Sequence, residues 1–237
     1  MSRKVDRNLW NEYFKVYDVL NLAIPYQELL DAIVTALEIR AGDIVLDAGC
    51  GTGNLAIKMK EKGAKVIGLD ICSEALDRYH KKHPDTEKLI HDLKEPLPFP
   101  DNYFDKLVLN NVIYTLDKQK RGIIFKEFYR VLKPGGKIVA ADPRKEMKSY
   151  IIYVDAVKKN KRREGILKTI ILVSKMAIPA IKMFHFNTLI VRESVGGDYD
   201  FIEETEITEL LKHSGFKNIS ENVLVYSEQS IMNSAVK

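Results

Sequence analysis

Short apolar runs alternate with helically spaced apolar residues through the middle of the chain. Apolar residues at helical spacing follow the run at 64–69, where Ser73 is a suitable N-cap for a helix. They also follow the run at 107–111, where Asp117 can cap another helix. Strands that alternate with helices predict a parallel sheet covered on both faces, with ligands at the strands' carboxyl ends. The runs with the length and composition of buried strands are 44–46, 64–69, 88–91, 107–111 and 137–141.

The two ends of the chain extend this pattern. Residues 10–20 are aromatic with helical spacing, and an apolar stripe continues to residue 37. Near the other end, a predicted helix over 205–216 precedes alternating runs at 217–226 and 230–236. Alternation of this kind is typical of an antiparallel hairpin at a sheet edge, which would bring the sheet to seven strands.

Candidate chemistry begins directly after the first run, where Asp47-Ala-Gly-Cys-Gly-Thr-Gly53 leads into a helix. Glycines permit a sharp turn that a ligand can approach closely. Asn54 stands where a dinucleotide-binding G-x-G-x-x-G loop needs its third glycine. A carboxylate at Asp47 would repel a pyrophosphate but attract an ammonium group. The loop therefore favours a ligand with a cationic group over a dinucleotide.

Acidic residues also follow the next two predicted strands. Asp70 comes about twenty residues after the loop, where nucleotide-binding α/β domains place an acid that contacts ribose. Asp92 follows the third strand, a position where an Asp alone is usually a turn former. Farther on, the sequence contains a P-F-P-D-N-Y-F-D segment at 98–105 and R-V-L-K-P-G-G at 130–136.

Together these motifs resemble the class I S-adenosylmethionine-dependent methyltransferases, in the same order and spacing from about residue 42 to 142. The resemblance implies a Rossmann-like α/β fold with a seven-stranded, mostly parallel sheet, helices on both faces, an N-terminal helical segment and a helical cap after strand five. It implies S-adenosyl-L-methionine as cofactor and methyl transfer to an O, N or C atom of a small, hydrophobic or lipid-like molecule. The implied cofactor contacts are Tyr17, Asp47, Gly49, Cys50, Gly51, Asp70, Ile71, Asp92, Leu93 and Asn110.

A catalytic base is not assigned. Tyr13, Tyr17 and His185 are candidates for removing a proton from the acceptor. We expect no metal site, because His80 and His83 share a helix face with no cluster of acidic or thiol ligands. A nicotinamide-dependent oxidoreductase and a non-catalytic adaptor that binds the cofactor stay open as alternatives.

A basic insertion follows the fifth predicted strand. Residues 144–182 hold eleven Lys or Arg and three acidic residues, a net charge of +8 in a chain of +4. Lys168, Lys175 and Lys182 recur every seven residues beside a broad apolar surface, and we expect a bend at Pro179. The first interpretation is a cap packed on the core. A lid, an oligomer contact, or peripheral contact of 158–184 with an anionic membrane are alternatives.

The sequence gives little support for a nucleic-acid-binding, membrane-spanning or secreted protein. RNA stays open as an acceptor, although we expect no nucleic-acid partner because no recognised RNA-binding module is present. No run is apolar enough to span a membrane, and two cysteines without a paired pattern indicate reduced thiols, so we expect a cytoplasmic protein. The expected parts are an N-terminal lid (1–41), a cofactor-binding core (42–143), a cap (144–200) and a final helix with hairpin (201–237).

Overall fold

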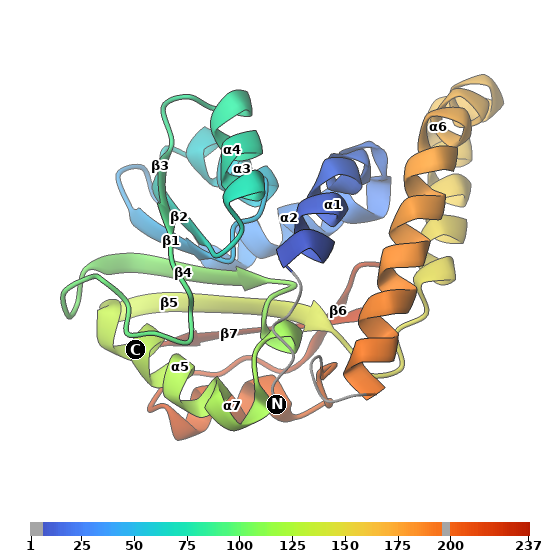
Figure 1. The fold of residues 1–237 in the computed structure, drawn as a ribbon. Coiled ribbons are helices and arrows are strands. Elements are labelled where there is room, and N and C mark those ends of the chain that lie inside the picture. Colours follow the sequence, from blue (N-terminus) through green and yellow to red (C-terminus); the bar gives the residue numbers. More distant parts are fainter. Residues whose placement is uncertain (1–6, 196–199) are drawn as a thin grey trace.

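A seven-stranded mixed sheet forms the centre of the computed structural model, which describes residues 7–195 and 200–237 (Figure 1). The strand order is β3-β2-β1-β4-β5-β7-β6. The first five strands pair in parallel, and β7 and β6 add antiparallel at one edge. The predicted α/β fold is confirmed. The strands are β1 (Ile44–Ala48), β2 (Lys65–Asp70), β3 (Glu87–Ile90), β4 (Phe104–Asn110), β5 (Leu132–Pro143), β6 (Val223–Val225) and β7 (Ser230–Val236).

Side-chain alternation along the strands supplies two apolar cores, one on each face. Val45 and Val108 belong to one core, whereas their neighbours Leu46 and Leu109 belong to the other. Because successive strand residues point to opposite faces, a strand buried on both sides must be apolar at nearly every position. This requirement explains why the strands appear in the sequence as continuous apolar runs.

Helices cover both faces of the sheet. Figure 1 shows α2, α3 and α4 over one face and α5 and α7 over the other, while a long α6 projects away from the sheet. The N-terminal α1 lies against α6 and α4. The helical elements are α1 (Arg7–Tyr17), η1 (Asp18–Leu22), α2 (Ile24–Leu37), α3 (Asn54–Glu61), α4 (Ser73–Lys82), η2 (Ile113–Thr115), α5 (Lys118–Val131), α6 (Ser149–Val195) and α7 (Glu206–His213).

Several local expectations needed correction. The N-cap of α4 is Cys72, not Ser73, because Asp70 Oδ1 accepts the Cys72 amide hydrogen and holds that residue extended. The break in α6 lies at Gly165, with φ 86° and ψ 174°, rather than at Pro179. β5 begins at Leu132, directly after α5. By contrast, Asp117 caps α5 as predicted, through the Gln119 amide at 3.0 Å.

The two motifs of 98–105 and 130–136 are joined by charged side chains. Arg130 donates to the carbonyl oxygen of Phe99 at 2.8 Å and to the Asp101 carboxylate at 2.8 Å. Lys133 donates to Asp105, whose other oxygen accepts the Ile44 amide at 2.9 Å. These contacts fix the start of β1 and β4 relative to α5, so both motifs have a structural role remote from the strands' carboxyl ends.

Arg121 is a fully buried cation on α5. It donates to the carbonyl oxygens of Leu116 at 3.1 Å and Asp200 at 2.7 Å, and it pairs with the Glu206 carboxylate on α7. A buried ion pair adds little net stability, but removing one partner leaves an uncompensated charge. Arg121 therefore joins α5, α7 and the segment that follows α6.

We expect Arg121→Met to lower the free energy of unfolding by about 3 to 5 kcal/mol, because the Glu206 carboxylate and two carbonyl groups lose their donor. Urea unfolding followed by circular dichroism measures this change. The control is Arg78→Met, which removes a half-exposed ion pair with Glu74 and should cost less than about 1 kcal/mol. A loss as small for Arg121→Met as for the control would contradict the assigned role.

Candidate active site

The glycine loop between β1 and α3 is held against β2 by its own backbone. The amides of Gly49 and Cys50 donate to the Leu69 carbonyl at 2.7 and 3.0 Å, and the Gly51 amide donates to Asp70 Oδ2 at 2.8 Å. Gly51 has φ 52°, and a Cβ there would lie 2.9 Å from the Phe14 ring. The loop thus leaves no room for a side chain between itself and α1.

Gly53, the last glycine of the loop, has a different role. A Cβ at this position would come within 2.1 Å of the Tyr79 ring, which is fully buried on α4. Gly53 therefore permits α3 and α4 to pack closely. The three glycines of the motif do not share one function.

Two carboxylates are buried at the carboxyl ends of adjacent strands. Burial, and then the nearby Asp70 charge, raise the pKa of Asp47 to about 7, and its Oδ2 atom has no hydrogen-bond partner. Burial also raises the pKa of Asp70, although its two oxygens accept the Gly51 and Cys72 amides. Of these two carboxylates, Asp47 is the one with an unfilled acceptor, which suits a ligand that brings a donor or a positive charge.

Asn110 ends β4 on the other side of β1. Its Oδ1 atom is buried and has no hydrogen-bond partner, and its side chain lines the same pocket as Asp47. Buried polar atoms in proteins are nearly always hydrogen-bonded. Two unfilled acceptors facing one pocket from neighbouring strands indicate a binding site for a molecule with hydrogen-bond donors.

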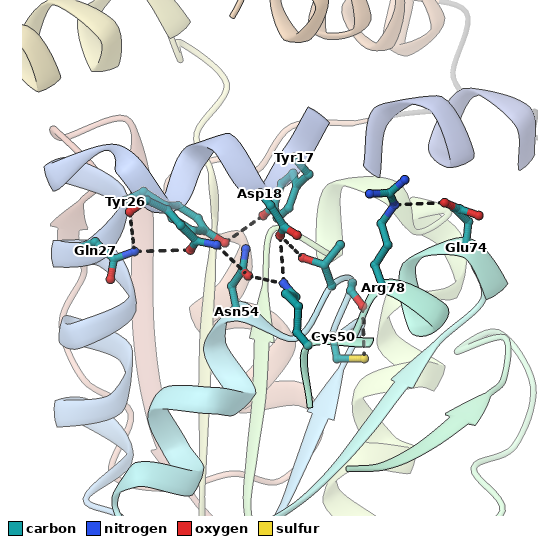
Figure 2. Close-up of polar contacts among 12 residues, drawn as sticks. Tyr17, Asp18, Tyr26, Gln27, Cys50, Asn54, Glu74 and Arg78 are labelled. Carbon is teal, nitrogen blue, oxygen red and sulfur yellow. Dashed lines mark hydrogen bonds and ion pairs between the residues drawn. The ribbon is translucent and has the colours of Figure 1, made fainter. Parts of the chain in front are cut away.

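A polar network ties the N-terminal segment to this loop (Figure 2). Asp18 Oδ1 accepts from the Thr52 hydroxyl at 2.6 Å and from Lys82 Nζ at 3.0 Å. Lys82 also donates to Asn54 Oδ1 at 2.8 Å, and that oxygen accepts from Asn21 at 2.9 Å. The segment that follows α1 is thereby fixed to both α3 and α4.

Aromatic rings of α1 close over the loop. Tyr13 and Phe14 are buried, and the Tyr17 ring contacts both, with centroids 5.4 and 5.5 Å away. The Tyr26 hydroxyl donates to the Tyr17 hydroxyl at 3.2 Å. Burial raises the pKa of Tyr13 and of Tyr17 above the usual value for a phenol. At neutral pH both groups keep their proton, so they suit donation or packing better than proton removal.

The pocket continues from the strand ends into an apolar chamber beneath α6. Its wall is formed by residues of α6 on both sides of the break at Gly165, by α1, and by the turn between β6 and β7. The side chains that line this chamber are mainly aromatic or sulfur-containing. Among them are Trp10, Tyr13, Ile152, Met176, Met183 and Tyr226. The arrangement places a polar, acidic edge next to an apolar space.

The remaining residues from the sequence lie outside this pocket. Ile71 is 42% exposed after β2, and Leu93 is buried in the core beneath α5. Asp92 follows the edge strand β3, where its Oδ1 accepts the Lys94 amide at 2.9 Å. His185 is exposed on α6 beside Phe186 and does not line the pocket.

Sequence reasoning missed several residues of the site. Tyr17 was predicted to contact the cofactor, whereas the carboxylate of the next residue, Asp18, accepts a hydrogen bond from Thr52 of the loop. Tyr226 reaches the pocket from a turn in which it has φ 54°. No pattern in the sequence marks this contact, because it depends on how β6 and β7 pair beside β5.

Comparisons with known proteins agree with this geometry. Residues 46–140 match a family model described as a methyltransferase domain. The chain is 31% identical to a demethylmenaquinone methyltransferase of Chlorobaculum tepidum, covering 100% of this chain and 93% of that protein. A phosphoethanolamine N-methyltransferase of Plasmodium falciparum is 30% identical over 48% of this chain and 44% of its own length.

Among solved structures, an S-adenosylmethionine-dependent methyltransferase of Aquifex aeolicus has a TM-score of 0.61 at 17% identity, covering 98% of both chains. This likeness concerns the fold, and the sequence identity above extends it to the family. The acidic strand ends, the glycine loop and the similarity over nearly the whole of both chains lead to one conclusion. The chain belongs to the class I S-adenosylmethionine-dependent methyltransferases.

Proposed function

We propose that this protein transfers the methyl group of S-adenosylmethionine to an O, N or C atom of a small hydrophobic or lipid-like molecule. The observation that carries the proposal is the continuity of the pocket, in which Asp47 and Asn110 share one space with Met176 and Met183. A charged, donor-bearing ligand suits the first pair, and an apolar acceptor suits the second.

The residues present fit the cofactor. Asp47 Oδ2 and Asn110 Oδ1 are buried acceptors without partners, which an ammonium group can satisfy. Gly51 offers backbone at a place where a Cβ would strike Phe14. When bound, S-adenosylmethionine supplies a methyl group on a sulfonium sulfur that an acceptor atom can attack in line. The protein then contributes alignment and exclusion of water.

The cofactor contacts predicted from the sequence divide into two groups. Tyr17, Asp47, Gly49, Cys50, Gly51 and Asn110 line the pocket described above. Asp70 ends β2, Ile71 follows it, and Asp92 and Leu93 follow β3. We assign these four residues to the adenosine part of the ligand. In this assignment Asp70 binds the ribose hydroxyls with the second lone pairs of its two oxygens.

For the acceptor, the demethylmenaquinone methyltransferase named above directs the first choice to a reduced, prenylated quinone precursor. The apolar chamber supports a molecule of this kind better than a charged one. Neither Tyr13 nor Tyr17 is assigned as a base, because burial keeps both phenols protonated. We assign Tyr17 a positioning role over the loop. Family membership favours methyl transfer over nicotinamide-dependent chemistry, and RNA is kept as an outcome of the acceptor test.

The acceptor test measures transfer of a radiolabelled methyl group to a water-soluble, short-chain demethylmenaquinol, with phosphoethanolamine and RNA as competing acceptors. We expect the label in the quinol. Met176→Glu should raise KM for the quinol at least about tenfold, since a buried charge must be desolvated, and leave affinity for S-adenosylhomocysteine unchanged. The control is Val173→Glu, on the exposed side of the same helix. Label only in phosphoethanolamine or RNA would contradict the hydrophobic acceptor.

A second test concerns the ribose assignment of Asp70. We expect the parent protein to bind S-adenosylhomocysteine about 10- to 100-fold more tightly than its 2′,3′-dideoxy analogue, because hydrogen bonds to a charged acceptor are worth about 1.5 to 3 kcal/mol. Asp70→Asn should lose most of that preference, and the exposed Asp77→Asn should keep it. Calorimetry measures the six affinities, two ligands for each of the three proteins. An equal preference in the Asp70→Asn protein would exclude the assigned contact.

The third test uses the raised pKa of Asp47. With a pKa of about 7, this carboxyl holds a proton below neutral pH and becomes anionic above it. Affinity for S-adenosylhomocysteine should therefore increase as the pH rises from about 5.5 to about 8, by up to about tenfold per unit below the pKa. 5′-Methylthioadenosine, which lacks the ammonium group, should show no such dependence, and neither should Asp47→Asn. Parallel pH profiles for the two ligands would exclude the proposed pairing.

A further inference from the structure

The long α6 is a hairpin of two antiparallel helical arms. Gly165, with φ 86° and ψ 174°, separates residues 149–164 from residues 166–195. Asn160 donates from one arm to the Thr169 hydroxyl of the other at 3.1 Å, next to the turn. Figure 1 shows the hairpin extending away from the sheet. Its tip is therefore carried well outside the body of the protein.

The second arm has one face that is buried against the protein and an opposite face that is exposed. Leu172, Met176 and Met183 are buried, with 9%, 7% and 3% exposure, and face the rest of the protein. Residues on the opposite arc are large, apolar and 45–73% exposed. They recur at intervals of three, four and seven residues, which places them on one side of the helix. This outer arc comprises Ile166, Leu167, Ile170, Ile171, Val173, Ile178, Ile181 and Phe184.

Basic side chains border the outer arc. Lys175 and Lys182 lie along one edge of it, and Lys158, Lys161 and Arg162 lie near the tip on the first arm. Within the described part of the chain, none of these five forms an ion pair, in contrast to Lys168, which pairs with Glu164 at 2.6 Å. The surface therefore combines exposed apolar area with positive charge that the protein itself does not neutralise.

Exposed apolar area together with unpaired positive charge favours one kind of binding partner for this surface. A second copy docking through the same arc would bring two segments of +8 together, and RNA would gain nothing from eight apolar side chains. An anionic bilayer matches both features, since apolar residues enter the acyl boundary while lysine and arginine side chains reach the headgroups. No helix in the described ranges has the length and apolarity to cross a bilayer.

We propose that the outer arc and tip of α6 dock on the surface of an anionic lipid bilayer, with the hairpin lying in the interface. The docking stands independently of the proposed function. Its link to the acceptor rests on that function: Met176 and Met183 line the pocket from the inner side of the same arm. A docked hairpin would hold the pocket one helix diameter from the lipid, so that a hydrophobic acceptor has a short path inward.

Co-sedimentation with vesicles tests the docking. We expect the parent protein to bind vesicles of equal parts phosphatidylglycerol and phosphatidylcholine, and to bind pure phosphatidylcholine far less. Each basic residue near the surface contributes about a fivefold change in partitioning. Raised salt should weaken binding without abolishing it, because the apolar contribution is not screened.

Two triple variants separate charge from apolar insertion. Lys161→Glu with Lys175→Glu and Lys182→Glu should lower partitioning at least about 100-fold. Leu167→Gln with Ile178→Gln and Ile181→Gln should remove the salt-resistant part. Both sets are exposed, so the fold is not expected to change. The matched control is Lys94→Glu with Lys120→Glu and Lys212→Glu, which alters net charge equally on other surfaces and should retain most of the binding.

Three outcomes would overturn the proposal. The first is absence of sedimentation with anionic vesicles by the folded parent. The second is equal loss of binding in the control and in the hairpin charge variant. The third is a parent protein that does not bind vesicles and is a dimer by analytical ultracentrifugation, together with a glutamine variant that is a monomer. That result would assign the outer arc to self-association. Calorimetry with S-adenosylhomocysteine on each variant reports on the cofactor site separately, so failure of docking and failure of the proposed function are distinguishable.

Discussion

Burial of carboxylates at the carboxyl ends of the central strands is the constraint on which this structure depends. A pKa near 7 for Asp47 corresponds to on the order of 4 kcal/mol of unfavourable free energy for its charged form. Asp70, the neighbouring acid, is held by two amides, one of which belongs to the glycine loop. The two apolar cores offset this burial. The same arrangement fixes the loop and leaves Asp47 able to attract a cation.

The core of the fold could be predicted because each of its features is local in the sequence. A buried parallel strand must be apolar on both faces, and a turn against another backbone needs glycine, so β1, the loop and β2 are visible as patterns. The R-V-L-K-P-G-G motif was also recognisable. The physical reason for this motif could not be recognised from the sequence, because Arg130 and Lys133 donate hydrogen bonds to residues about thirty positions earlier in the chain.

The features that the sequence did not predict depend on partners remote in the chain. Ser73 has the right chemistry for an N-cap, but Asp70 binds the Cys72 amide and shifts the helix start. Gly165 breaks α6 because the chain reverses there, whereas Pro179 is accommodated within the second arm. Asp18 and Tyr226 enter the site through contacts that exist only once α1, α4 and the final hairpin have packed.

The reversal at Gly165 has an evolutionary consequence. Both arms of the hairpin leave and rejoin the body at one end, so their lengths are not fixed by the sheet. Insertion or deletion of about seven residues in each arm, roughly two helical turns, would preserve which side faces inward. Relatives could therefore acquire longer or shorter arms, and with them new reach and new acceptors, while the strand ends that surround Asp47 stay the same. The length of the hairpin can therefore diverge without disturbing the strand ends.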